Sequence, residues 1–200
     1  MLVRDHMSSK VITVARDCSL ADARALLQKH RFRHLPVLHK DRLAGIVSDR
    51  DLRGAAPAKK TVSEVMTAKP SVIAPEAPID EAARLLRSLK VGALPVVEGP
   101  RLIGILTTSD ILDAFVQLCG VGEPTYHLLL SGGDGKEVKW RVRRVVDSQH
   151  GDLKWLYRNP RAGTVHLRVR ATNIDDIVAG LEADGFEVST ILSPTLPRRA

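Results

Sequence analysis

The feature that most constrains the fold of this sequence is an internal repeat. Residues 3–52 align with residues 62–111 without a gap, at an offset of 59. The identical pairs include Val3/Val62, Met7/Met66, Lys10/Lys69, Pro36/Pro95, Gly45/Gly104 and Asp51/Asp110. Because a unit of about 55 residues buries little apolar surface alone, the repeat predicts two copies that share a core in one module.

Each copy is predicted to fold as β-α-β-β-α. In the first copy the pattern indicates a short strand at 11–14, a helix with apolar residues at helical spacing from Leu20 to Leu27, strands at 34–38 and 42–47, and a second helix from Asp49. The second copy repeats this order, with strands at 72–73, 93–97 and 101–106 and helices that begin near Ile79 and at Ser109.

The last third of the chain has a different pattern. Strands are expected at 126–130, 153–158, 164–171 and 186–192, and helices at 137–149 and from Asn173 or Asp175 to Leu181. This β-α-β-β-α-β order is the ferredoxin-like arrangement, so the predicted fold class is α+β. The predicted boundaries are 1–59 and 60–119 for the two copies, 120–125 for a linker, 126–193 for the third domain and 194–200 for a tail.

Composition excludes several classes of protein. The 200 residues are 44% hydrophobic and 26% charged, which is typical of a globular chain. No stretch approaches the ~18 consecutive apolar residues of a membrane span, and the first residues lack the layout of a secretory signal, so we expect a cytoplasmic protein without a membrane partner. The net charge of +7 is spread thinly and the aromatic content is 4%, so nucleic acid is not the expected partner.

The sequence shows no catalytic or metal-binding motif. Its 7 histidines are scattered, and no nucleophile stands at a known spacing from a base. Cys18 and Cys119 cannot form a disulfide framework or a four-thiolate metal site, so both are interpreted as small hydrophobic side chains. We therefore predict a non-catalytic protein with no cofactor and no metal.

Both copies close with a hydroxyl-x-x-Asp motif, at the point where a strand is expected to end and a helix to begin. The motif runs from Ser48 to Asp51 in the first copy and from Thr107 to Asp110 in the second. A carboxylate there can accept two hydrogen bonds from a ribose diol, and the backbone N–H groups of a helix start favour phosphate. The alternative is simple helix capping, because Ser, Thr and Asp are favoured N-caps.

The order of motifs in each copy resembles a known family. Each copy begins with M-(S/T)-x-K and continues through L-P-V to G-I-(V/L)-(S/T)-x-x-D. This order resembles the tandem cystathionine-β-synthase (CBS) domain pair, over residues 1 to about 118. The resemblance implies two units with clefts between them that commonly bind AMP, ADP, ATP or S-adenosylmethionine. It also implies a homodimer, and the fold occurs with empty clefts as a dimerisation element.

The family pattern assigns two composite clefts to this chain. One cleft would combine the first motif with residues near 68–73, and the other would combine the second motif with residues near 9–14. The resemblance thus implies one set of nucleotide-binding residues, Ser48, Asp51, Lys69 and Ser71, and a second set, Thr107, Asp110, Lys10 and Val11.

The two clefts are not expected to be equivalent. Before the L-P-V strand, where the family commonly places phosphate contacts, the first copy has Arg33 and His34 and the second has Gly92 and Ala93. Arginine offers a forked donor for phosphate, and histidine a donor that titrates near neutral pH. We expect one tight phosphate-binding cleft per chain, that of Asp51, with an affinity that rises from about pH 8 to about pH 6. The alternative is a solvated surface pair.

The last third resembles an ACT domain in its topology and its glycine-rich first turn. In that family small ligands bind near this turn at a dimer interface, which would nominate Gly132, Gly133 and Asp134. A plain loop of turn-favouring residues is the alternative. A CBS pair followed by an ACT-like domain resembles the bacterial acetoin-utilisation regulatory proteins.

Two functions follow from these resemblances. The first is a regulatory sensor that binds an adenine nucleotide or adenosyl ligand between the repeats and transmits the bound state to the ACT-like domain or to a partner such as a regulated enzyme. The second is a dimerisation scaffold with vestigial clefts.

Overall fold

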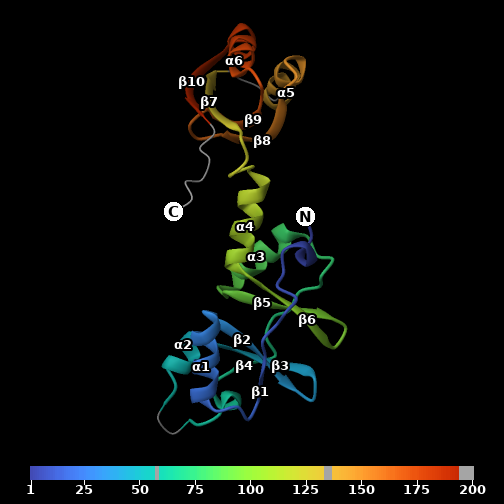
Figure 1. Ribbon diagram of the computed structural model, residues 1–200, viewed down its shortest axis with the longest axis vertical. Helices are drawn as coiled ribbons and strands as arrows, with labels where there is room; N and C mark the ends of the chain where they lie inside the picture. The colour runs from blue at the N-terminus through green and yellow to red at the C-terminus, as the bar shows by residue number, and fades with distance from the viewer. Residues whose placement is uncertain (57–58, 133–136, 194–200) are drawn as a thin grey trace. The chain divides into compact units, whose positions relative to one another are not determined.

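The computed structural model describes residues 1–56, 59–132 and 137–193 (Figure 1). The chain divides into two units, Met1–Ala114 and Phe115–Ala200. Among the described residues, no helix is both long and apolar enough to cross a membrane.

The first unit contains both repeats. The first repeat comprises the 3-10 helix η1 (Val3–Asp5), β1 (Val14–Ala15), α1 (Leu20–His30), β2 (His34–His39), β3 (Arg42–Ser48) and α2 (Asp49–Arg53). The second comprises η2 (Val62–Glu64), β4 (Thr67–Ala68), α3 (Ile79–Leu89), β5 (Ala93–Glu98), β6 (Arg101–Thr107) and α4 (Thr108–Leu118), which runs past the end of the unit. The helices and the two hairpins lie where the sequence predicts them.

The opening strands are shorter than predicted. The strand expected at 11–14 is reduced to Val14–Ala15, which pairs in parallel with β2. The strand expected at 72–73 is wrong, because Ile73 makes only an isolated bridge to Val96. Pro70 and Pro75 flank this segment and have no backbone N–H to extend a ladder.

Each repeat lends its opening segment to the other. The sheet of the first repeat has the order β1-β2-β3-β4, so β4, from the start of the second copy, pairs with β3. In the same way Ser8, from the start of the first copy, bridges Ile105 of β6. The backbone N–H of Val3 donates to the carbonyl of Ala77, and the backbone N–H of Val62 donates to the carbonyl of Cys18. The two donors are 59 residues apart and so are the two acceptors, so the repeat makes these hydrogen bonds equivalent.

The hydrophobic cores follow this exchange. Val3 is fully buried in the core of the second repeat, and Val62 in the core of the first. Gly45 and Gly104 complete the pattern, because a Cβ at either position would collide with the sulfur of Met66 or of Met7, respectively. The two glycines leave room for the methionines of the exchanged segments.

The second unit has the β-α-β-β-α-β order predicted for the last third. It comprises β7 (Tyr126–Gly132), α5 (Val138–Ser148), β8 (Asp152–Asn159), β9 (Thr164–Arg170), α6 (Ile174–Ala183) and β10 (Phe186–Leu192). All neighbouring strands are antiparallel, in the order β10-β7-β9-β8.

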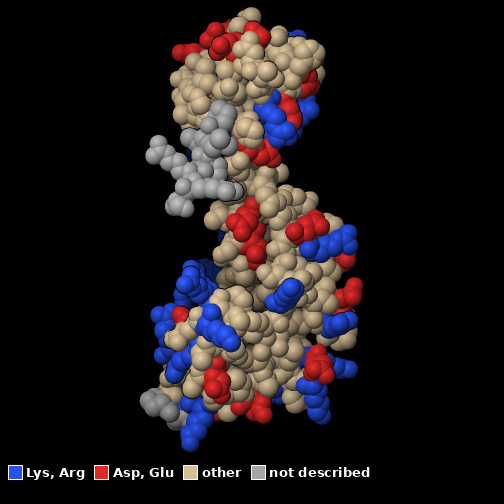
Figure 2. All heavy atoms as spheres, viewed as in Figure 1, with Lys and Arg blue, Asp and Glu red and all other residues tan. Residues whose placement is uncertain are grey.

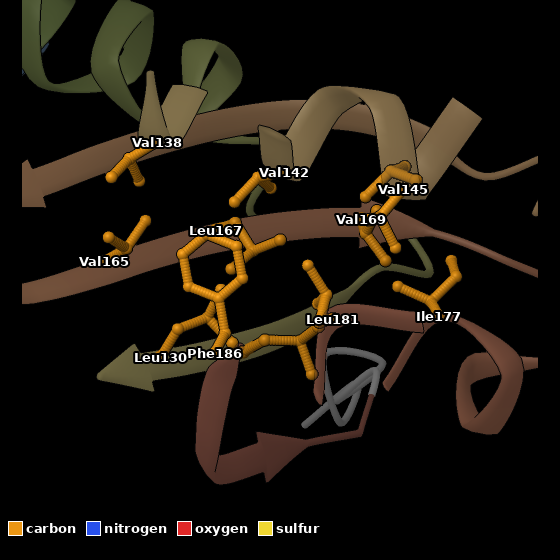
Figure 3. Packing of buried hydrophobic residues seen from close by; sticks show 12 residues of the cluster. Leu130, Val138, Val142, Val145, Val165, Leu167, Val169, Ile177, Leu181 and Phe186 are labelled. Carbon is orange, nitrogen blue, oxygen red and sulfur yellow. The ribbon is translucent and has the colours of Figure 1, made fainter. Parts of the chain in front are cut away.

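Both helices of the second unit cover the same face of this sheet. Figure 3 shows Val142 and Val145 of α5 and Leu181 of α6 packed against Leu167 and Val169 of β9. Because side chains alternate along a strand, His166 and Arg168 of β9 point to the opposite face of the sheet.

Candidate functional site

A cavity in the first unit has a volume of about 770 Å³ and receives residues from both repeats. Its wall is formed by the start of β2, the end of β3, the helix α2, the segment that follows β4, and the turn between α3 and β5. The cavity therefore lies between the two copies of the repeat, as the composite cleft of Asp51 requires.

Six of the residues singled out in the sequence meet at this cavity. Its lining includes Arg33, His34, Ser48, Asp51, Lys69 and Ser71. The second set, Lys10, Val11, Thr107 and Asp110, does not line it. The exchanged segment explains the meeting: β4 pairs with β3 and thereby brings Lys69 and Ser71 beside the Ser48–Asp51 motif.

Asp51 belongs to a helix capping box in which Ser48 is the N-cap, as the capping interpretation predicted. Its Oδ2 accepts hydrogen bonds from the backbone N–H of Ser48 (2.8 Å) and from the Ser48 hydroxyl (2.6 Å), while Ser48 Oγ accepts from the N–H of Asp51. Capping leaves the second carboxylate oxygen available, because Oδ1 makes no hydrogen bond within the described chain. Capping and ligand contact are therefore compatible at this residue.

The second motif forms the same cap. Asp110 Oδ2 accepts from the backbone N–H of Thr107 (2.6 Å) and from its hydroxyl (2.7 Å). Asp110 is thus a structural twin of Asp51 that lies outside the cavity, which makes it a natural control for the capping role.

The wall of the cavity is rich in positive charge. Arg33, Arg50, Lys69 and Lys90 line it, and within the described residues none of the four forms an ion pair. Arg53 also lines it but is paired with Asp49 at 2.5 Å. The space-filling view shows Lys and Arg side chains gathered over the α1–α2 side of this unit (Figure 2). An anionic group would find unpaired cations here.

His34 is partly buried, and burial lowers its pKa below the usual value. Arg33 lowers the pKa further, and the carboxylate of Asp51 opposes both effects. The lowered pKa favours the neutral imidazole of His34 at pH 7. The pH window expected from the sequence, about 8 to 6, is corrected to lower pH, because the sequence could not show this burial.

Gly92 and Ala93 correct a second expectation. They were expected to distinguish the Asp110 cleft, but they line the same cavity as Asp51, Arg33 and His34. The two pre-strand segments meet at one cavity, so their sequence difference cannot by itself separate two clefts.

Several lining residues escaped the sequence argument, among them Arg50, Arg53, Thr67 and Lys90. Arg50 and Arg53 lie next to Asp51, and their proximity to the motif was an available signal. Lys90 has a left-handed backbone conformation (φ 55°) at the end of α3, as does Arg31, 59 residues earlier, at the end of α1. The repeat could have identified this pair as equivalent turns.

The ligand turn proposed for the ACT-like domain is described only in part. Gly132 ends β7 with φ +79°, whereas Gly133 and Asp134 lie outside the described residues. The tail from 194 to 200 lies outside them too. No group of three or more metal-ligating side chains gathers in the described part of the chain.

Comparison with known families covers the first unit. A family model for the CBS domain matches residues 3–58 and 62–117. A CBS domain-containing protein of Dictyostelium discoideum is 35% identical over 135 residues, which are 59% of this chain and 93% of the relative. Inosine-5′-monophosphate dehydrogenase of Korarchaeum cryptofilum is 37% identical over 102 residues, but these are 50% of this chain and only 21% of the enzyme.

Solved structures give the same picture. The CBS domain pair of protein MJ0100, solved with 5′-methylthioadenosine and S-adenosyl-L-methionine, has a TM-score of 0.56 at 32% identity and covers 58% of this chain and 97% of that one. The AMP complex of CBSX2 has a TM-score of 0.55 at 33% identity and covers 58% and 96%. A putative acetoin utilization protein from Vibrio cholerae has a TM-score of 0.56 at 33% identity and covers 62% and 96%.

Proposed function

Because the chain belongs to the CBS domain family, we propose that its first unit is a non-catalytic sensor that binds an adenosyl ligand in the cavity of Asp51. One observation carries this proposal: six predicted binding residues, contributed by both repeats, line a single cavity of about 770 Å³. That volume falls within the range of about 300–1,000 Å³ that is typical of small-molecule sites.

Different residues of the cavity would contact different parts of the ligand. Oδ1 of Asp51 can accept hydrogen bonds from the ribose hydroxyls, since the cap occupies only Oδ2. Arg33, Lys69 and Lys90 offer donors to a phosphate group. The related structures contain AMP, 5′-methylthioadenosine and S-adenosyl-L-methionine. The unpaired cations favour AMP, ADP or ATP for this chain, because an anion gains more there than a cationic sulfonium does.

The position of the cavity supports a route by which binding would become a signal. Residues of both repeats line it, so a ligand that contacts both stabilises one arrangement of the repeats over others. The bound state would then reach a regulated partner, such as an enzyme, or the second unit. The ferredoxin-like strand order of that unit supports an ACT-like regulatory module, and the likeness to the Vibrio cholerae protein supports an acetoin-utilisation regulator.

A second candidate function is assembly. Helix α4 exposes Leu112 (61%), Phe115 (53%) and Leu118 (56%), which is unusual for large apolar side chains that no partner covers. A homodimer through this helix would bury them, and a scaffold role needs no ligand. Light scattering of the chain and of a Leu112→Asp variant tests the assembly: the dimer mass should fall to the monomer mass in the variant.

Ligand binding is tested by thermal unfolding with AMP, ATP and S-adenosyl-L-methionine. A ligand present at 100 times its dissociation constant adds about 2.7 kcal/mol to the free energy of unfolding. The sensor proposal expects such a shift with at least one adenosyl compound, beyond any shift that inorganic phosphate alone produces. If no adenosyl compound raises the melting temperature, the scaffold function replaces it.

A further inference from the structure

The second unit contains a small cavity that the function proposed above does not use. Its volume is about 100 Å³, and it lies between the 121–125 segment, the start of β7, β9 and the end of β10. All its lining residues belong to the second unit. The polar side chains that matter here are Glu123, Thr125, His127 and Arg168.

Arg168 brings a positive charge to this cavity without a carboxylate partner. It lies on β9, on the face of the sheet opposite the helices, and its side chain is partly buried. It donates one hydrogen bond, to the hydroxyl of the buried Thr125 at 3.3 Å, and forms no ion pair within the described chain. A guanidinium has five N–H donors, so most of the donors of Arg168 have no protein acceptor among the described residues.

His127 lies directly across the sheet from Arg168. Its Nε2 is buried and has no hydrogen-bond partner among the described residues. A buried polar nitrogen without a partner is costly, and such groups usually bind a ligand or an ordered water. The ring of His166 lies 5.7 Å away between centroids, and Leu192 flanks His127 on the other side.

The one acidic side chain in the lining is already neutralised. Glu123 forms ion pairs with Arg170 at 2.5 Å and with Lys154 at 3.9 Å, and both of these cations come from outside the cavity lining. The charge balance at the cavity is therefore positive, and Arg168 is its source.

We propose that this cavity binds a small oxyanion, a carboxylate or phosphate group, through the guanidinium of Arg168, beside the imidazole of His127. The size of the cavity sets the class of ligand. At about 100 Å³ it is well below the range of about 300–1,000 Å³ that is typical of small-molecule sites, so it suits an oxyanion group better than a nucleoside. The planar fork of arginine matches two oxygens of either group.

The charge state of His127 gives the proposal a local readout. Burial lowers its pKa, and electrostatic interactions with Arg168 and His166 lower it further. An anion seated between His127 and Arg168 acts in the opposite direction, because it favours the protonated imidazole. Glu123 faces the same cavity, but its carboxylate stays paired with Arg170 and Lys154.

The experiment follows each histidine of the full-length chain by NMR titration in chloride, inorganic phosphate and acetate at equal ionic strength. We expect the pKa of His127 to rise by about one unit in phosphate, in acetate or in both, relative to chloride. A response to phosphate alone identifies a phosphate site, and a response to acetate a carboxylate site. A His127 titration that is identical in all three salts overturns the proposal.

Matched variants separate this cavity from other anion sites. Arg168→Gln should abolish the response of His127, whereas Arg143→Gln, on the exposed surface of α5 and outside the lining, should preserve it. Arg33→Gln should also preserve it, since Arg33 lies in the first unit. If Arg168→Gln does not fold, Arg168→Lys keeps the charge but loses the fork, and a weaker response is expected. An unchanged response in a folded Arg168 variant contradicts the assignment.

Discussion

The imidazole of His34 occupies the space that a side chain at Gly92 would need. A Cβ on Gly92 would lie 2.7 Å from Cε1 of His34, which no real contact tolerates. His34 and Gly92 come from different copies of the repeat and line the same cavity. The absence of a side chain at residue 92 thus fixes where the histidine can lie.

Gly92→Ala should push the imidazole of His34 out of its place. Since the end of a side chain can move, we expect a modest loss of stability, about 1 kcal/mol. The displaced ring becomes more exposed to water, so the pKa of His34 should rise toward its usual value. Histidine NMR titration measures this. Gly54→Ala, in the same unit, is the control and should leave the pKa of His34 where it is.

Asp51→Ala should lose both a cap and a ligand contact, while Asp110→Ala should lose only a cap. Each loss of a cap should cost about 0.5–2 kcal/mol of stability, measured by denaturant unfolding. Only Asp51→Ala should weaken the tight binding of AMP or ATP, by roughly 1.5–3 kcal/mol in calorimetry. Equal affinities in the two variants would show that Asp51 is a cap alone.

The pH dependence of stability should change when His34 is replaced. Its pKa is lower in the folded state than in the unfolded chain. Between the folded value and about 6.5, the unfolded chain binds more protons, so stability falls as the pH drops through this window. His34→Gln should make the profile flatter below about pH 6.5. The pKa of His127 is also lowered in the folded state, so His127 should produce the dependence of stability on pH that remains in His34→Gln.

Ligand affinity should respond in the opposite sense. A bound phosphate favours the protonated His34, so the affinity for AMP should increase as the pH drops below about 6.5. Calorimetry at a series of pH values measures this, with adenosine as the uncharged control. The phosphate of AMP itself titrates at about pH 6, so the role of His34 is contradicted if His34→Gln shows the same pH response as the unsubstituted protein.

The exchanged segments predict that Val3 and Val62 protect the opposite copy. Truncation of a buried aliphatic side chain costs about 1–3 kcal/mol. Val3→Ala should therefore speed hydrogen exchange in β5 and β6, and Val62→Ala in β2 and β3. Each variant is the control for the other. If hydrogen-exchange protection were lost instead in the copy that contains the substituted valine, the exchange of opening segments would be ruled out.

The repeat made much of this fold predictable, because identical patterns at 34–48 and 93–107 demand equivalent hairpins. It could not show which core receives Val3, since the two cores have the same apolar chemistry. For the same reason the repeat alone could not assign Asp51 and Lys69 to one cleft, and only the family pattern did so. Lys90 reaches the cavity because its backbone is left-handed, and a lysine in the sequence does not indicate that conformation.

The cavity at His127 and Arg168, two partly buried residues, could not be predicted from the sequence either. Alternation along β7 and β9 predicts that both point away from the helices, but that face of a sheet is ordinarily wet. Only the return of the 121–125 segment over it, where Thr125 is 2% exposed, turns it into a cavity.

The reciprocal placement of Val3 and Val62 also bears on how such a chain could arise. A molecule with a single copy would find a receptor for its opening segment only on a second molecule, and would be an obligate pair. Gene duplication places donor and receptor on one polypeptide and makes that pairing independent of concentration. Two fragments made by cutting between the copies should accordingly fail to fold when separate and recover their structure when mixed.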